Sequence, residues 1–159
     1  MILNLTQHQA TPAQINAGVV DLPADRRAKL EQLLTVEKEV LIASPETRDT
    51  VLRSRVESIL ALVFDELAQW RRDQTEKAAE LFANGERIAA WSVATTYIGQ
   101  AMIGGAPYLT ERLAKRLKEL DVEPLYAASE RASVEQTMSD GTVRKVVSFA
   151  HLGFIPSVA

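Results

Sequence analysis

The sequence predicts an α/β fold with a short, mostly parallel sheet, a long amphipathic helix and a C-terminal β-hairpin. Two apolar segments, residues 1–6 and 100–103, each lead through a short turn into a helix that begins at a proline. Between them, residues 45–82 repeat apolar side chains at spacings of three and four, as a helix does. Near the end of the chain, two partly alternating segments flank the hairpin turn Ser139-Asp140-Gly141.

The composition is that of an ordinary globular protein. Hydrophobic residues make up 47% and charged residues 25% of the chain, which predicts one domain over residues 1–159. The net charge of −3 gives no positive field, so duplex nucleic acid is not an expected partner. There is no cysteine, and no apolar run approaches the roughly 20 residues of a membrane-spanning helix. We expect a soluble, cytoplasmic protein that does not contact membranes.

The first strand is expected over residues 1–6 and ends in the polar residues 7–9. A helix start follows: Thr11 is a hydroxyl N-cap, Pro12 suits the first position, and Gln14 can reach back to the cap. Ligands of open α/β sheets bind outside the carboxyl ends of the strands. The region of residues 7–9 is therefore expected at the ligand-binding edge.

The middle of the chain is expected to be mainly helical. An extended link over residues 18–23 leads to a helix at about residues 26–34, and residues 40–42 are compatible with a short strand. The longest helix starts at Pro45 behind the N-cap Ser44 and continues to about Phe82. This length exceeds what one crossover needs, which predicts packing against a second subunit in a homodimer. A kinked helix lying across one sheet face is the alternative.

After a further helix to about Thr95, a strand from Gln100 runs into the turn Gly104-Gly105 and a helix that begins at Pro107. That helix carries a leucine stripe on one side and basic residues in its last turns. Free N–H groups at the start of a helix bind anions, phosphate in particular. The alternative is a plain connection in which the glycines only turn the chain.

A third buried strand is expected over residues 124–129, before the hairpin. Just beyond it, Arg131 can clamp a phosphate and Glu130 can accept from a ribose hydroxyl or a base amine, unless both merely solvate the hairpin. His8 and His151, the two histidines, are candidates for acid–base chemistry, with a structural role as the alternative. No spaced ligand set predicts a metal, and no cofactor motif is present.

Both ends of the chain resemble small CRISPR-associated proteins of the Csx type. The resemblance lies in Leu3-Asn4-Leu5-Thr6-Gln7-His8 with Thr11 and Gln14, in Pro124-Leu125-Tyr126-Ala127-Ala128-Ser129-Glu130-Arg131, in Glu135, in Asp140-Gly141-x-Val143, and in Phe149-x-His151-x-x-Phe154. It implies a compact Rossmann-like three-layer core related to the CARF domains that sense cyclic oligoadenylate. Some members of that group are metal-independent ring nucleases in antiviral defence.

The resemblance also implies a site. An adenylate ring would lie across the two-fold axis of a dimer, with its phosphates at Thr11 and at the N–H groups of Gly104, Gly105 and Ala106. The pocket would be lined by Thr6, Gln7, His8, Ser129, Glu130 and Arg131. In cleavage the 2′-hydroxyl attacks the adjacent phosphate, so that His8 would move the proton and Arg131 would stabilise the developing charge.

Two other classes of function remain open from the sequence. One is a different α/β enzyme or small-nucleotide sensor on the same scaffold, because a fold does not fix a function. The other is a structural or interaction protein, for which the long helix with Phe64 and Trp70 is the specific feature.

Overall fold

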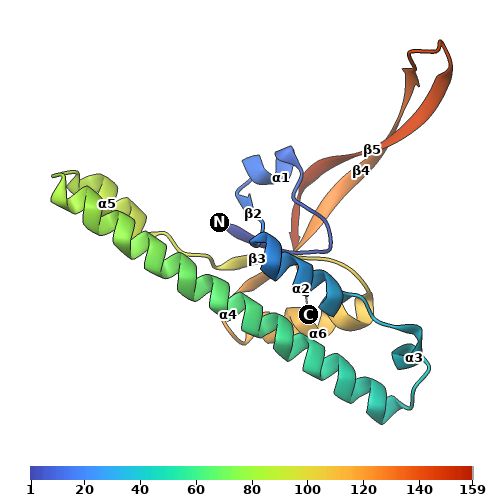
Figure 1. The fold of residues 1–159 in the computed structure, drawn as a ribbon, viewed down its shortest axis with the longest axis horizontal. Helices are drawn as coiled ribbons and strands as arrows, with labels where there is room; N and C mark the ends of the chain where they lie inside the picture. Colours follow the sequence, from blue (N-terminus) through green and yellow to red (C-terminus); the bar gives the residue numbers. More distant parts are fainter. Residues whose placement is uncertain (159) are drawn as a thin grey trace.

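The computed structural model describes residues 1–158 as a mixed α/β fold built on one five-stranded sheet (Figure 1). The elements, in chain order, are β1 (Ile2–Leu5), α1 (Pro12–Asn16), β2 (Val19–Val20), α2 (Ala24–Leu34), α3 (Lys38–Leu41), α4 (Pro45–Ala83), α5 (Arg87–Thr95), β3 (Gln100–Ile103), α6 (Pro107–Lys118), β4 (Glu123–Thr137) and β5 (Val143–Pro156).

The sheet has the order β2-β1-β3-β4-β5, and its first four strands are parallel. β5 returns antiparallel along β4. Leu5 pairs with Ile103, and Ile103 pairs with Tyr126, so β1 and β3 end side by side and β4 passes the same edge. The chain leaves β1 toward β2 and leaves β3 in the opposite direction, toward β4. The carboxyl ends of β1 and β3 therefore form a topological switch point, where α/β sheets commonly bind ligands.

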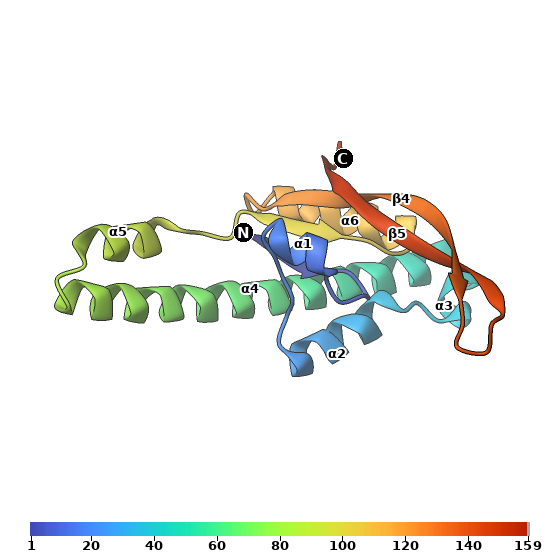
Figure 2. The same cartoon turned by 90° about the horizontal axis from the view of Figure 1, so that it is seen from above.

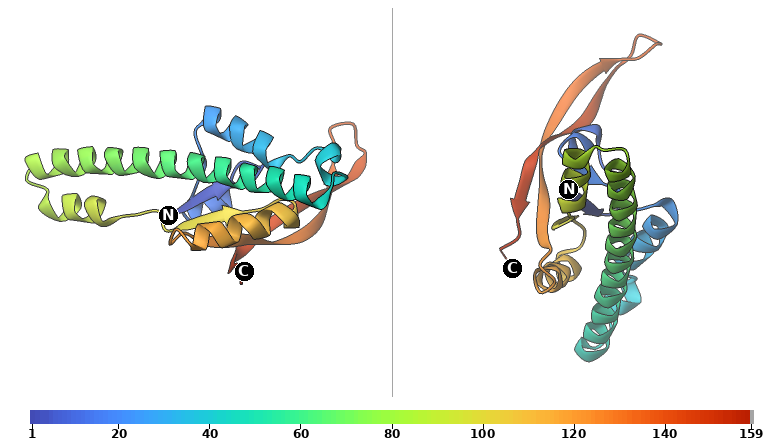
Figure 3. Two further views of the ribbon diagram at one scale, coloured as in Figure 1. Left: turned by 90° about the horizontal axis from the view of Figure 1, so that it is seen from below. Right: turned by 90° about the vertical axis from the view of Figure 1, so that its left-hand side faces the viewer.

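One face of the sheet carries the main core. α2, α4 and α6 lie together on this side (Figure 3), and their leucine, isoleucine and valine side chains pack against Leu3, Leu5, Ala101 and Ile103. Because side chains alternate along a strand, Ile2 and Met102 belong to the other face. There they form a smaller cluster with Ala10, Val19, Leu125 and Phe154. The two faces are thus covered unequally.

Three helices, α1, α4 and α6, begin where the sequence predicts. Thr11 and Gln14 form a complete capping box at α1, and the Ser44 hydroxyl accepts the Thr47 N–H at the start of α4. α4 runs unbroken for 39 residues, and its first half packs on one face of the sheet, as the alternative expected, but without the kink. The leucine stripe of α6 is confirmed, because Leu109, Leu113 and Leu117 are fully buried.

Ion pairs fasten α6 to α4 on the surface. Arg112 contacts Asp49 at 2.6 Å, and Arg116 contacts Glu57 at 3.0 Å. The hydrogen bond from Arg112, with further attraction from Arg53, lowers the pKa of Asp49 below its ordinary value of 3.8. These exposed pairs add orientation more than stability.

Three expectations need correction. Val19–Val20 lies in the expected link but pairs with β1 as a short strand. Residues 38–41 form the helix α3, where a short strand over residues 40–42 was the alternative. β4 does not end near Ser129 but continues to Thr137, so strand and hairpin are one continuous ribbon. A β-bulge at Ala128/Ser129 lets this long strand change direction without ending.

Two parts of the fold project from the body. The outer half of α4 extends with α5 beyond the sheet, and the β4–β5 ribbon extends on the other side (Figures 1 and 2). Within residues 1–158, no helix is both long and apolar enough to cross a membrane.

Candidate functional site

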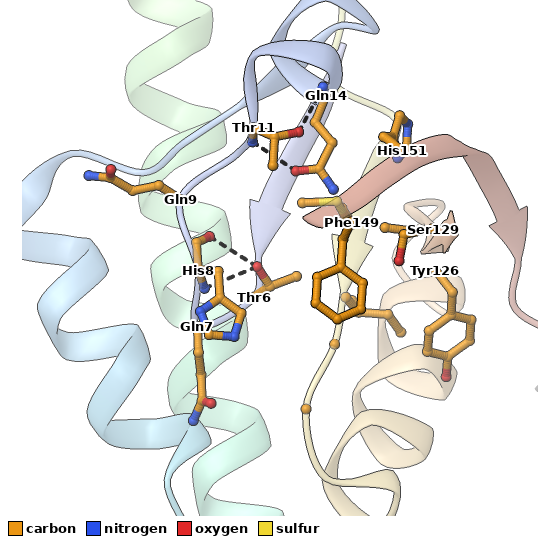
Figure 4. A pocket seen from close by; sticks show the side chains of 15 residues that line it. Thr6, Gln7, His8, Gln9, Thr11, Gln14, Tyr126, Ser129, Phe149 and His151 are labelled. Atoms are coloured by element: carbon orange, nitrogen blue, oxygen red, sulfur yellow. Dashed lines mark hydrogen bonds between the residues drawn. The ribbon is translucent and has the colours of Figure 1, made fainter. Parts of the chain in front are cut away.

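A cleft of about 570 Å³ lies at the carboxyl edge of the sheet, over the switch point between β1 and β3 (Figure 4). This volume is within the range of small-molecule sites, roughly 300–1,000 Å³. The loop after β1, the turn after β3 and the facing parts of β4 and β5 contribute its walls. The lining residues are Thr6, Gln7, His8, Gln9, Thr11, Gln14, Met102, Ile103, Gly104, Gly105, Tyr126, Ala127, Ser129, Phe149 and His151.

A buried amide fixes the loop after β1. Asn4, only 3% exposed, donates from Nδ2 to the His8 carbonyl at 2.8 Å and to Asp21 Oδ1 at 2.5 Å. Its Oδ1 accepts from the N–H and the hydroxyl of Thr6. Asp21 also accepts the N–H of Ala10, so residues 6–10 are held in place at both ends. The loop is therefore pre-formed beside the cleft.

The glycine turn after β3 brings backbone close to the cleft. A Cβ on Gly104 would lie 3.3 Å from Thr6 Cγ2, so β1 and β3 approach closely where they end. Gly105 has φ of +124°, a conformation that side-chain-bearing residues rarely adopt. Ala106 is the N-cap of α6 and offers no side-chain cap, so no side-chain oxygen at this position competes with an anion. Pro107 has no N–H and the Leu109 N–H donates to the Ala106 carbonyl, so the first turn of the helix contributes the Tyr108 N–H beside those of the glycine turn.

The opposite wall comes from the bulged part of the ribbon. Ser129 pairs with His151 and Arg131 pairs with Phe149, which places these four residues on one face. Figure 4 shows Phe149, Ser129 and His151 gathered there near Tyr126. The His151 ring packs on Phe154 with centroids 4.7 Å apart. Both of its ring nitrogens are buried without a hydrogen-bond partner among the described residues, which is costly unless a bound group supplies one.

The lining is suited to an anion. It contains both histidines of the chain and no aspartate or glutamate, although the whole chain has 21 acidic residues. Amides and hydroxyls from Gln7, Gln9, Gln14 and Thr6 supply further polar groups. In residues 1–158 no group of three or more histidine and acidic side chains is placed to hold a metal ion.

The structure brings seven of the ten residues selected from the sequence to this cleft: Thr6, Gln7, His8, Thr11, Gly104, Gly105 and Ser129. Thr11 is already engaged, because its N–H donates to Gln14 Oε1 at 2.9 Å and its hydroxyl accepts the Gln14 N–H. Ala106 adjoins the cleft at the start of α6.

Glu130 and Arg131 do not line the cleft. Because β4 continues through both residues, its alternation places Glu130 on the opposite face of the ribbon from Ser129. Arg131 lies on the same face as Ser129 but one pair further out, beside Phe149. Only Arg131 therefore faces the side on which the cleft opens.

Sequence reasoning passed over several contributors. Asn4, the one polar residue inside the apolar segment Ile2–Leu5, signals a buried hydrogen-bonding role by its position alone. Tyr126 and Phe149 form aromatic walls that depend on the pairing of β4 with β5. The hairpin turn at residues 139–141 predicts that two strands pair, but not that the pairing continues back to Tyr126.

The fold and cleft define a mixed α/β protein with a ligand-sized site at the switch point of its sheet. The model of the Uncharacterized protein MJ1673 family matches residues 39–155, and the chain belongs to this family. Neither the curated proteins nor the solved structures gave a match.

Proposed function

We propose that the cleft binds an anionic ligand built from nucleotides, and that this ligand is the cyclic oligoadenylate suggested by the resemblance at the two chain ends. The observation that carries the proposal is the lining, which has both histidines and no carboxylate in an acidic protein. A cationic ligand would find no carboxylate partner in this lining, whereas the two histidines, when protonated, attract an anion.

The phosphate position is assigned to the uncapped start of α6. Its first N–H groups follow directly from Gly104 and Gly105, which line the cleft and let a ligand approach the backbone. The base position is assigned to the ribbon wall. Tyr126 and Phe149 offer ring faces for stacking, and the free nitrogens of His151 can bond a base edge.

We further infer that the sheet is a Rossmann-like core. The order β2-β1-β3-β4 with parallel pairing is that of doubly wound folds, which supports the inference. The short α1 would then represent the helical layer of the second face. The absence of cysteine supports a cytoplasmic location.

Cleavage of the ring is the enzymatic form of the proposal and needs no metal in principle. The 2′-hydroxyl would attack its neighbouring phosphate while the cleft holds the two in line. His8, exposed at the end of the loop that Asn4 fixes, would take or return the proton. Arg131 would approach the developing charge from the ribbon.

The binding test is thermal unfolding with cyclic tetra-adenylate and cyclic hexa-adenylate, with inorganic phosphate as the reference. Ligand at 100 times its dissociation constant adds about 2.7 kcal/mol, which raises the midpoint by roughly 5–10 °C in a chain of this size. No shift with either ring would reject the proposal. A shift with inorganic phosphate alone would reject the nucleotide and retain an anion site.

Two variants at one position locate the phosphate. Ala106→Asp supplies an N-cap that stabilises α6 by about 0.5–2 kcal/mol but puts a negative charge where the phosphate would lie. Ala106→Asn supplies a similar cap without charge. We expect binding to be lost in the aspartate variant and kept in the asparagine variant, and equal binding by both would contradict this position. A change at Gly104 is less informative because an added Cβ meets Thr6.

Chromatography of the incubated nucleotide separates binding from cleavage. A linear product that disappears in His8→Ala, with the thermal shift retained, would support the role of His8. Intact ring with a full shift would make the protein a binder, and full cleavage by His8→Ala would remove the proposed role.

A further inference from the structure

The projecting helical pair is the most exposed apolar structure in the described chain outside the cleft and ribbon. We call residues 71–97 the arm: the last third of α4, the turn at Asn84-Gly85, and α5 with the residues that follow it. Figures 1 and 2 show this pair extending past the end of the sheet. α5 packs on α4 through Ala90, which is 6% exposed, and through the half-buried Ala89 and Val93.

Four large apolar side chains of the arm are largely exposed, with the Arg87 guanidinium 5.8 Å from the centre of the Phe82 ring. Ile88 is 89% exposed, Trp91 73%, Tyr97 68% and Phe82 63%. Ile88 and Trp91 lie three residues apart in α5 and so belong to one helix face. Three large aromatic side chains and an isoleucine left this open on a short segment mark an interaction surface.

The base of the arm is hollowed. A groove of about 420 Å³ lies between α4 and α5 and is lined by Trp70, Arg71, Gln74, Thr75, Ala78, Ala94, Thr95 and Tyr97. The arm therefore carries protruding side chains at its tip, Phe82 and Ile88, and a receiving groove at its base. The protruding side chains and the groove both belong to the arm, as an interface between two identical surfaces requires.

We propose that the arm is a homodimer interface, in which two arms pack antiparallel about a two-fold axis as a four-helix bundle. This axis lies away from both clefts, so each ring would bind within one cleft, whereas the resemblance implies binding across the axis. Trp70 and Phe82 are separated by about 18 Å along α4, at 1.5 Å per residue. Because a two-fold axis imposes the same separation on both copies, each tip reaches the groove of the other. Phe82 and Ile88 of one copy then fill the groove beside Trp70 and Tyr97 of its partner.

Charge and area favour a second copy as the occupant. The arm carries four basic residues and four acidic ones (Arg71, Arg72, Lys77 and Arg87; Asp73, Glu76, Glu80 and Glu86), so two arms do not repel although the whole chain carries −3. With 150–250 Å² for each aromatic side chain, the four exposed side chains supply roughly 500–600 Å² per copy. A standard interface buries about 800 Å² per partner, and the polar flanks supply the rest.

Sedimentation equilibrium of the full chain tests the interface. We expect a species of twice 17.5 kDa at micromolar concentration. The double variant Ile88→Glu/Trp91→Glu should be monomeric, because four desolvated charges would face each other in the bundle. The matched control is Ile42→Glu, which changes a 75% exposed isoleucine at the far end of α4 and should remain dimeric.

A monomeric wild type at 100 micromolar, or a double variant that stays dimeric, would overturn the proposal. Circular dichroism checks that the double variant keeps its helix content, which is expected because both side chains are exposed.

Cysteine cross-linking tests the antiparallel orientation, since the chain has no cysteine of its own. Asn84→Cys marks the tip and Arg71→Cys marks the groove. Co-expressed, the two variants should give a disulfide-linked pair between tip and base. Efficient cross-linking of Asn84→Cys with itself would mean tip-to-tip packing and would overturn the antiparallel arrangement.

Discussion

Asn4 in β1 and Asp21, directly after the neighbouring strand β2, are joined by a hydrogen bond: Asn4 Nδ2 donates to Asp21 Oδ1 at 2.5 Å, beside the loop that lines the cleft. Asn4→Ala should therefore disorder the loop as well as destabilise the fold. The Thr6 N–H and the Asp21 carboxylate each lose their bond to Asn4, whereas the Thr6 hydroxyl and the His8 carbonyl keep the 3.1 Å bond between them. Unpaired buried groups cost about 1–3 kcal/mol, measurable by urea unfolding. The control Asn84→Ala, at an exposed helix end, should change stability by no more than about 0.5 kcal/mol, and equal losses in both would contradict the role of Asn4.

Gly105 should tolerate substitution poorly for a purely conformational reason. An added Cβ would meet only Thr110 Cγ2, at an ordinary 3.9 Å, whereas φ is +124°. Gly105→Ala should lower the free energy of unfolding by about 1–3 kcal/mol. Gly105→Asn should lose a similar amount, because asparagine tolerates positive φ at about +50 to +70° and not at +124°. Urea unfolding measures the free energy of unfolding of both variants. An alanine variant as stable as the wild type would contradict the prediction that φ at this position excludes a side chain.

Replacing His151 with phenylalanine should separate stability from binding. The change removes two buried nitrogens that have no partner in the described chain and keeps a ring against Phe154. We expect thermal stability of the free protein to stay equal or rise by about 1 kcal/mol, while ligand-induced stabilisation falls. His8→Phe, at the exposed histidine, should leave the stability of the free protein unchanged. If His151→Phe unfolds several degrees lower, the imidazole has a structural role instead.

Low pH should weaken the ion pair between Arg112 of α6 and Asp49 of α4. The hydrogen bond from Arg112 lowers the pKa of Asp49 from 3.8, so its stabilisation is present above pH 3.8 and is lost as pH falls through the lower pKa of the folded state. Asp49→Asn should therefore unfold at a lower temperature than the wild type at pH 7, and the gap should close below pH 3.8. Asp65→Asn, elsewhere on α4, is the comparison. A gap independent of pH would mean that the carboxylate charge is unimportant.

Local signals predicted most of the helices and the parallel core. The Thr11 capping box, the Ser44 cap and the leucines of α6 depend only on neighbours along the chain, and all are confirmed. The cleft residues of β1 and β3 followed from one rule, that parallel strands end at the same edge. The rule places residues 7–9 and the Gly104-Gly105 turn at one edge, whereas Thr6 is implied by the resemblance.

What could not be predicted depends on pairing between distant segments. The two residues of β2 are a strand only because β1 pairs with them, and Ser129 faces His151 only through a register shift. The expected positions of Glu130 and Arg131 assumed a strand that ends, whereas β4 continues past them. Whether a strand ends or bends at a bulge is decided by its partner, which the local sequence does not reveal.

The groove at the base of the arm lies where the chain enters the arm and where it returns to the sheet. Trp70, before the excursion, and Tyr97, after it, line the same hollow. The sheet and its cleft are therefore joined to the arm at a single point, and the arm behaves as an insert in the loop ahead of β3. Each helical turn added to both of its helices would lengthen it by about 5.4 Å. In a dimer paired through the arms, a longer insert would move the two clefts further apart, with neither cleft altered.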